Sequence, residues 1–93
     1  MTPFHTLHIL NKTPDHPRFG ECLGSLGADD ALILTESGVL ALAADVSPNT
    51  SRVYALASDV QARGMTGKTG NAVVVDYGDM VDLTLQAQRV ISW

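Results

Sequence analysis

Two runs of this chain are apolar without interruption, and they constrain its fold more than any other feature. Residues 31–34 read Ala-Leu-Ile-Leu and residues 72–75 read Ala-Val-Val-Val. A strand with one face in water alternates apolar and polar side chains, whereas a strand covered on both faces does not. These runs therefore predict strands inside a sheet that has helices on both sides, the usual arrangement of a parallel sheet.

Five strands separated by four helical segments are predicted along the chain. The strands cover residues 5–10, 31–35, 52–56, 72–76 and 89–93. The helical segments cover residues 17–26, 38–44, 58–63 and 79–87, with Asp79 as the expected N-cap of the last one. Such alternation in 93 residues predicts a single α/β domain over residues 1–93. We expect a small three-layer sandwich built on a mostly parallel five-stranded sheet.

Charge and composition exclude several classes of function. The formal net charge is −4 and the six Lys and Arg residues are scattered singly, which argues against direct nucleic-acid binding. The first residues do not resemble a signal peptide, and no apolar run approaches the ~20 residues of a membrane span. A single cysteine suits a reducing compartment, so we expect a cytoplasmic protein without membrane contact. Small aliphatic-rich domains often gain stability from other subunits, or from copies of themselves when isolated.

The single cysteine, Cys22, is the obvious candidate for chemistry. A lone thiol forms neither an internal disulfide nor a thiolate metal cluster. Phe19, Cys22, Leu23 and Leu26 follow the i, i+3, i+4, i+7 spacing of one apolar helix face, which predicts that the thiol points into the core. Burial raises a thiol pKa and weakens the nucleophile. Arg18, one turn earlier, would act in the opposite direction, so persulfide chemistry at Cys22 stays open as an alternative.

Two other motifs, a segment that resembles a phosphate-binding loop and a set of three histidines, are weak evidence for a binding site. Residues 62–69 nearly spell a phosphate-binding loop, but a predicted helix precedes them and a strand follows, the reverse of the required order. A connecting loop is the better interpretation. The histidines at 5, 8 and 16 lack the spacing of a chelating set, so no metal site is predicted.

Polar residues follow three of the predicted strands and should share one edge of a parallel sheet. They are Asn11, Lys12, Glu36, Asp76 and Tyr77. Ligands of parallel α/β sheets bind beyond the carboxyl ends of the strands, so this edge could be a binding crevice or a rim that docks another subunit. No nucleophile with a histidine base accompanies it. We therefore predict no independent catalysis and no cofactor.

Several segments, in order along nearly the whole chain, carry a family resemblance. They are Leu-His-Ile-Leu-Asn-Lys-Thr-Pro at 7–14, Asp-Ala-Leu-Ile-Leu at 30–34, Glu-Ser-Gly-Val at 36–39, Val-Tyr-Ala-Leu at 53–56, Asp-Val-Gln-Ala-Arg-Gly at 59–64, Val-Asp-Tyr at 75–77, Val-Asp-Leu-Thr at 81–84 and Trp93. Together they resemble the TusB/DsrH family of sulfur-relay proteins.

The resemblance implies a role that spacing alone does not. Members look like the smallest of three related α/β subunits (DsrE/DsrF/DsrH-like), which assemble with TusD/TusC-like sister subunits as a heterohexamer holding two copies of each. Such complexes pass persulfide sulfur between small sulfur-carrier proteins, usually towards 2-thiolation of the tRNA wobble uridine and, in the Dsr branch, in sulfur oxidation. The principal cysteine belongs to a sister subunit.

Three hypotheses of function follow. The first is a structural, non-carrier subunit of a cytoplasmic sulfurtransferase complex. The second is a persulfide carrier that uses Cys22 in a Dsr-type complex. The third is a small-ligand or anion-binding module that uses the edge containing Lys12, Glu36 and Asp76.

Overall fold

The computed structural model describes residues 4–44 and 46–93, and strands alternate with helices along them. The elements are β1 (Phe4–Leu10), α1 (Pro17–Ser25), β2 (Ala31–Leu34), the 3₁₀ helix η1 (Glu36–Ala43), β3 (Val53–Leu56), α2 (Ala57–Ala62), β4 (Val73–Val75), α3 (Tyr77–Gln86) and β5 (Ala87–Ser92). The predicted order of strands and helices is confirmed. β5 begins at Ala87, two residues earlier than predicted, because it follows α3 without a loop.

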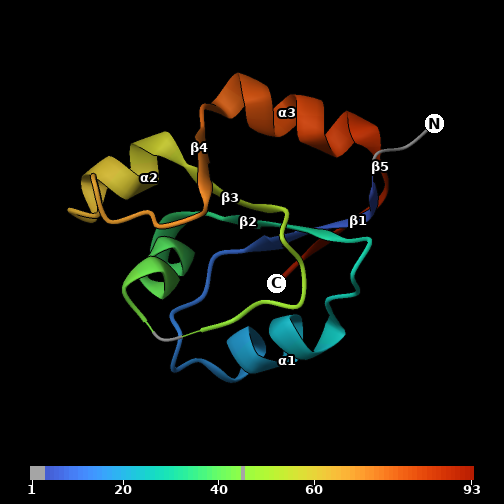
Figure 1. Ribbon diagram of the computed structural model, residues 1–93, viewed down its shortest axis with the longest axis horizontal. Coiled ribbons are helices and arrows are strands. Elements are labelled where there is room, and N and C mark those ends of the chain that lie inside the picture. Colours follow the sequence, from blue (N-terminus) through green and yellow to red (C-terminus); the bar gives the residue numbers. More distant parts are fainter. Residues whose placement is uncertain (1–3, 45) are drawn as a thin grey trace.

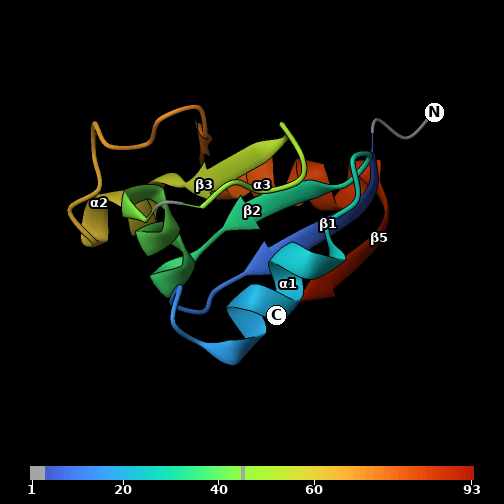
Figure 2. The same cartoon turned by 60° about the horizontal axis from the view of Figure 1, so that its bottom comes forward.

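The five strands form one sheet in the order β4-β3-β2-β1-β5, and every neighbouring pair is parallel. The α/β class and the five-stranded parallel sheet predicted from the sequence are therefore confirmed. Figure 2 shows β3, β2, β1 and β5 side by side. From β1 to β4 each connection moves one strand in the same direction, whereas the last connection crosses back to place β5 beside β1.

This strand order explains why the two faces of the sheet are covered unequally. Parallel crossovers are right-handed, so connections that step in one direction leave their helices on one face, and a step back puts its helix on the other. In accord with this rule, α1 and α3 lie on opposite sides of the sheet (Figure 1). The first face receives α1, η1 and α2, and the second receives α3.

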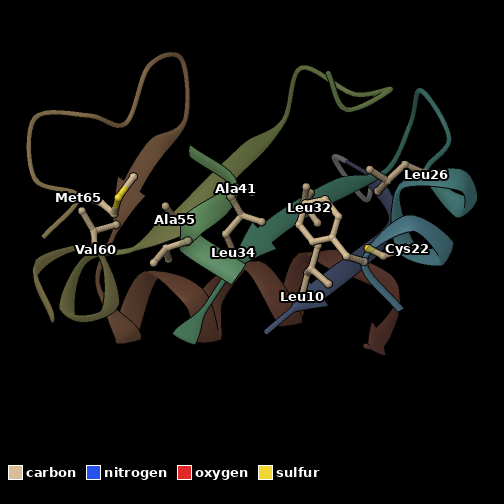
Figure 3. Close-up of a cluster of buried hydrophobic side chains, with 11 residues drawn as sticks. Leu10, Cys22, Leu26, Leu32, Leu34, Ala41, Ala55, Val60 and Met65 are labelled. Carbon is tan, nitrogen blue, oxygen red and sulfur yellow. The ribbon is translucent and has the colours of Figure 1, made fainter. Parts of the chain in front are cut away.

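The larger hydrophobic cluster lies on the face covered by α1, η1 and α2. It contains Leu10, Phe19, Cys22, Leu26, Leu32, Leu34, Val39, Ala41, Ala55, Val60 and Met65. Figure 3 shows Cys22 on α1 at one end of this cluster and Met65 at the other. The predicted apolar face of α1 is confirmed, since Phe19 and Cys22 are buried and Leu23 packs against the same cluster.

A smaller cluster lies between the sheet and α3. It contains Phe4, Leu7, Ala31, Ile33, Val75 and Leu83, with Met80 of α3 and Tyr54 of β3 packed against it. All four residues of β2 are buried, two on each face, as its continuous apolar sequence predicts.

The start of α3 differs from the prediction. Asp76, not Asp79, is the N-cap: its Oδ1 accepts a hydrogen bond of 2.7 Å from the backbone N–H of Asp79. In return, the backbone N–H of Asp76 donates to Oδ2 of Asp79 over 3.2 Å. This reciprocal capping box needs a side-chain hydrogen-bond acceptor at both positions, and only the geometry shows which of the two aspartates is the cap.

Candidate functional site

The Cys22 thiol is enclosed by the larger hydrophobic cluster. Its exposed fraction is 0%, and burial raises its pKa to about 12. Arg18, the cation expected to oppose this effect, places its guanidinium over the Trp93 ring at 5.5 Å from the ring centroid. The thiol therefore stays protonated at neutral pH and is shielded from a sulfur donor in this conformation.

Asn11 and Lys12, the first two predicted edge residues, directly follow β1. The Lys12 Nζ donates to Oδ1 of Asn11 over 2.6 Å and to the backbone oxygen of Trp93 over 2.8 Å. This contact ties the end of β1 to the residue that follows β5. The lysine thus links the carboxyl ends of β1 and β5, two neighbouring strands of the sheet.

The other three predicted edge residues follow β2 and β4. Glu36 begins η1 with a φ of 49°, and its backbone N–H donates to Oδ2 of Asp59 over 2.7 Å. Asp76 is occupied as the cap of α3, and the Tyr77 side chain is 68% exposed. β4 lies three positions from β1 in the sheet, and strands are ~4.8 Å apart, so Asp76 and Lys12 follow strands separated by roughly 14 Å. The structure thus spreads these five residues along one edge and brings only Asn11 and Lys12 into contact.

A polar cluster that the sequence did not reveal lies at the α1 side of β1. The buried His8 places its Nε2 at 2.9 Å from Oδ2 of Asp30, and its Nδ1 accepts a hydrogen bond of 3.0 Å from Nε1 of Trp93. The imidazole and indole rings are stacked at 6.1 Å between centroids. Because an indole nitrogen only donates, Nδ1 of His8 must accept, and the ring proton lies on Nε2 facing the carboxylate.

Asp30 is held by several donors at once. Its Oδ2 accepts from the backbone N–H of Gly27 over 2.9 Å as well as from His8. Burial acts to raise the pKa of Asp30, but the hydrogen bonds from Gly27 and His8 outweigh it and leave that pKa below its ordinary value. Both ring nitrogens of His8 are thus engaged by protein groups, so the imidazole orients neighbouring elements and has no nitrogen available to a substrate.

The signal for this cluster was present in the sequence but incomplete. A strand–helix–strand unit predicts that β1 and β2 are neighbours. His8 pairs in register with Leu32, and Asp30 precedes Leu32 by two residues, which puts both polar side chains on one face. The register between strands cannot be read from apolar runs, and Trp93 is 85 residues from His8. The sequence therefore could not show that these side chains meet.

A cavity of about 400 Å³ opens between α1, η1 and the middle of the sheet. Its apolar wall includes Phe19, Leu23, Leu34, Leu42 and Val53, and hydroxyl groups of nearby loops border it. Among the residues that the structure describes, those that line the cavity include no Asp, Glu, His, Lys, Arg or Cys. The described lining thus supplies apolar contact and hydroxyls but no acid–base pair.

The segment that resembles a phosphate-binding loop connects α2 to β4, so the interpretation as a connecting loop is confirmed. Gly64, Gly67 and Gly70 all have positive φ, at 68°, 79° and 56°. Buried Met65 anchors the loop to the larger hydrophobic cluster. The glycines therefore allow the backbone to make the tight turns of the loop that precedes β4.

The described residues contain neither a cluster of metal-ligating side chains nor a membrane-spanning helix. Within residues 4–44 and 46–93, no three His, Cys, Asp or Glu side chains are grouped closely enough to hold a metal ion. Over the same part of the chain, no helix has the length and apolar character needed to cross a membrane.

The fold and the contacts define a small parallel α/β domain whose single thiol lies in the core and whose buried histidine is fully engaged by protein groups. Comparison with known proteins gives the family. The family model described as "DsrH like protein" matches residues 12–90, and the chain belongs to this DsrH family. The TusB/DsrH resemblance seen in the sequence is thereby confirmed.

Individual relatives agree with this assignment. Protein TusB of Pectobacterium carotovorum is 35% identical to the chain, over 94% of this chain and 99% of that protein. Protein TusB of Escherichia coli O1:K1 is 33% identical over the same shares. The solution NMR structure of protein Tm0979 from Thermotoga maritima superposes with a TM-score of 0.69 and 25% identity, covering 86% of this chain and 91% of that one.

Proposed function

We propose that this protein is a structural subunit of a cytoplasmic sulfur-relay complex and supports persulfide transfer between other proteins without carrying sulfur itself. The pathway we propose leads towards 2-thiolation of the wobble uridine in tRNA. Similarity to TusB proteins over nearly the whole chain supports this assignment. In this proposal the working cysteine belongs to a TusD/TusC-like sister subunit, and this chain has no catalytic residue of its own.

The observation that carries the non-carrier role is the environment of Cys22. A persulfide carrier needs a thiolate that a donor can reach. Cys22 is 0% exposed and its pKa is raised to about 12, so it meets neither requirement. A persulfide sulfur added there would also need room inside a close-packed cluster.

The polar contacts around His8 support a structural role for the same reason. Catalytic histidines keep one ring nitrogen for the substrate, whereas His8 bonds to Asp30 and Trp93 through both. These contacts connect β1, the start of β2 and the end of β5. Such a network favours one rigid arrangement of the subunit.

Mass spectrometry of the assembled complex tests this proposal. The chain is co-expressed with the DsrE-like and DsrF-like subunits of the same organism, and the complex is supplied with sulfur by a cysteine desulfurase and a small carrier protein. Each subunit is then measured intact. We expect a gain of ~32 Da, one sulfur atom, on a sister subunit and an unmodified mass for this chain.

The control is the same chain unfolded in denaturant and alkylated, which shows that Cys22 is detectable when exposed. A complex with Cys22→Ala should load its sister subunit to the same extent. A gain of one sulfur atom on Cys22 in the folded complex would overturn the non-carrier role and favour the persulfide carrier.

A further inference from the structure

Large apolar side chains that are exposed gather on one face of this molecule. In the described residues they are Val73 (54%), Val74 (44%), Tyr77 (68%), Val81 (39%), Leu85 (77%) and Val90 (41%). Tyr77, Val81 and Leu85 belong to α3. Val73 pairs in register with Tyr54, and Val90 with Leu7, and both partners belong to the cluster under α3. Residues paired in register share a face, so five of the six lie on the α3 side.

The exposed apolar side chains gather on the α3 side because of the strand order. A parallel sheet normally has both faces covered by helices. Here α1, η1 and α2 cover one face, while α3 alone crosses the other, as its place above the sheet in Figure 1 shows. Valines at the two edges of the α3 face, Val73 in β4 and Val90 in β5, are left in contact with water.

The α3 helix is also apolar on its outer side. Met80 and Leu83 face the sheet, whereas Tyr77, Val81 and Leu85 recur every four residues and form a stripe on the solvent side. A helix on the surface of a monomer has one apolar face and one polar face. A helix that is apolar on its inner and its outer face is usually buried on both sides. The outer stripe therefore has the composition of a covered surface.

We propose that this outer stripe of α3 (Tyr77, Val81 and Leu85, hereafter the α3 stripe) docks a different subunit, whose contact surface is apolar and bordered by Lys or Arg. This inference rests on the proposed function, since it takes the partner to be one of the sister subunits of the relay complex. It assigns to α3 the surface through which this chain joins that complex.

The charges of α3 favour a different subunit over a second copy. Residues 77–86 contain Asp79 and Asp82 and no Lys or Arg, and the cap, Asp76, is also acidic. Asp82 is the neighbour of Val81 and is exposed. In a dimer formed by α3 against α3, carboxylates of both copies would border the same apolar contact, and like charges there cost affinity. A surface bordered by basic groups would instead complement them.

Valine and leucine residues exposed on the two faces are replaced by lysine to test the α3 stripe against the opposite face. Val81→Lys with Leu85→Lys places charge in the α3 stripe, and lysine is a good helix former, so α3 should remain intact. Val74→Lys is the matched control, because Val74 is similarly exposed but pairs in register with Ala55 of the opposite face. Circular dichroism and thermal unfolding of each isolated chain establish that it is folded.

The affinity of each variant for the complex of DsrE-like and DsrF-like subunits is then measured by calorimetry. We expect the double variant to bind at least 100-fold more weakly, because residues central to an interface commonly cost 10-fold or more each. Val74→Lys should bind within threefold of the unchanged chain. Asp82→Lys should bind about 10-fold more weakly, and binding of the unchanged chain should weaken as salt is raised.

The outcomes distinguish this inference from the proposed function. If the unchanged chain binds the sister subunits and the double variant binds equally well, the proposed function stands but the α3 stripe is not the docking surface. If the unchanged chain binds neither sister subunit, the proposed function and this inference both fall. If the isolated chain is a dimer that the double variant converts to a monomer while sister binding is unchanged, a second copy covers the stripe and the choice of partner is overturned.

Discussion

Nε1 of Trp93 donates a hydrogen bond of 3.0 Å to Nδ1 of the buried His8, and the two rings stack on each other. The contact joins β1 to the residue that follows β5, while Lys12 holds the backbone oxygen of the same tryptophan and Arg18 lies over its ring. Three elements are thereby fixed around one indole. The opposite ring nitrogen of His8 fixes the start of β2 through Asp30.

Trp93→Phe should destabilise the protein by about 1–3 kcal/mol. The substitution keeps an aromatic ring beside His8 but removes the indole donor of its buried Nδ1, and an unsatisfied buried polar atom costs about that much. Urea unfolding at pH 7, followed by circular dichroism, measures the change in the free energy of unfolding. A free energy of unfolding within about 0.5 kcal/mol of that of the unchanged chain, the usual range for surface substitutions, would show that the hydrogen bond contributes nothing measurable.

Asp30→Asn should remove a contribution to stability that depends on pH. The lowered pKa of Asp30 means that the folded protein binds a proton there more weakly than the unfolded chain. The contribution of its carboxylate is therefore complete above the ordinary value of 3.8 and is lost as the pH falls through the lower value of the folded state. Urea midpoints at a series of pH values should show the gap between the two proteins shrinking below about pH 4.

The exposed neighbour Asp29 supplies the control for this experiment. Asp29→Asn should leave the pH dependence of the unchanged chain intact, since the Asp29 side chain is exposed. A gap between Asp30→Asn and the unchanged chain that is constant from pH 6 to the acid limit would refute the linkage to this carboxylate.

Gly38→Ala should destabilise the protein, whereas Gly24→Ala should stabilise it. A Cβ on Gly38 would lie 2.1 Å from the backbone oxygen of Leu10, at the end of β1, so the backbone must shift at a cost of about 1–3 kcal/mol or more. A Cβ on Gly24 meets no atom within 4 Å, and alanine favours the helix by ~1 kcal/mol. Thermal unfolding of the two variants should move in opposite directions, and a Gly38→Ala protein as stable as the unchanged chain would contradict this packing.

Cys22 should react with thiol reagents only after unfolding. A pKa of about 12 instead of the ordinary 9.0 leaves about 1,000-fold less thiolate at a given pH, and burial restricts access further. The rate of labelling by an aromatic disulfide at pH 8 is compared in buffer and in concentrated guanidinium. Labelling in buffer at the rate of the unfolded chain would mean that the thiol is accessible.

The sequence predicted the sheet well because its signal is local. The uninterrupted apolar run at 31–34 marked a strand covered on both faces, and glycines marked the loop before β4. The run at 72–75 also marked a strand, but the expected cover on both faces was wrong there, because β4 lies at the edge of the sheet and leaves Val73 and Val74 exposed. Element ends were less certain where two residues suit one role. Asp76 and Asp79 can both cap a helix, and the capping box uses both.

The parts of the site that depend on distant contacts could not be predicted. His8 looked like one of three unrelated histidines, because nothing in the sequence fixes the register that brings Asp30 and Trp93 to it. Likewise, the sequence of the predicted helix at 79–87 does not show which of its apolar residues face the sheet. The structure places Met80 and Leu83 there and leaves Val81 and Leu85 exposed. Which of two apolar faces is covered depends on the topology of the whole sheet.

Sulfur transfer by the reconstituted complex distinguishes a structural subunit from a subunit that carries sulfur on Cys22. The rate at which persulfide sulfur passes from the upstream donor to the downstream carrier is measured with the unchanged chain, with Cys22→Ala and with this subunit omitted. We expect the complex with Cys22→Ala to transfer sulfur within about twofold of the unchanged complex, whereas omission of the subunit should abolish transfer, because the subunit acts through its structure. An assembled complex that contains Cys22→Ala and no longer transfers sulfur would contradict it.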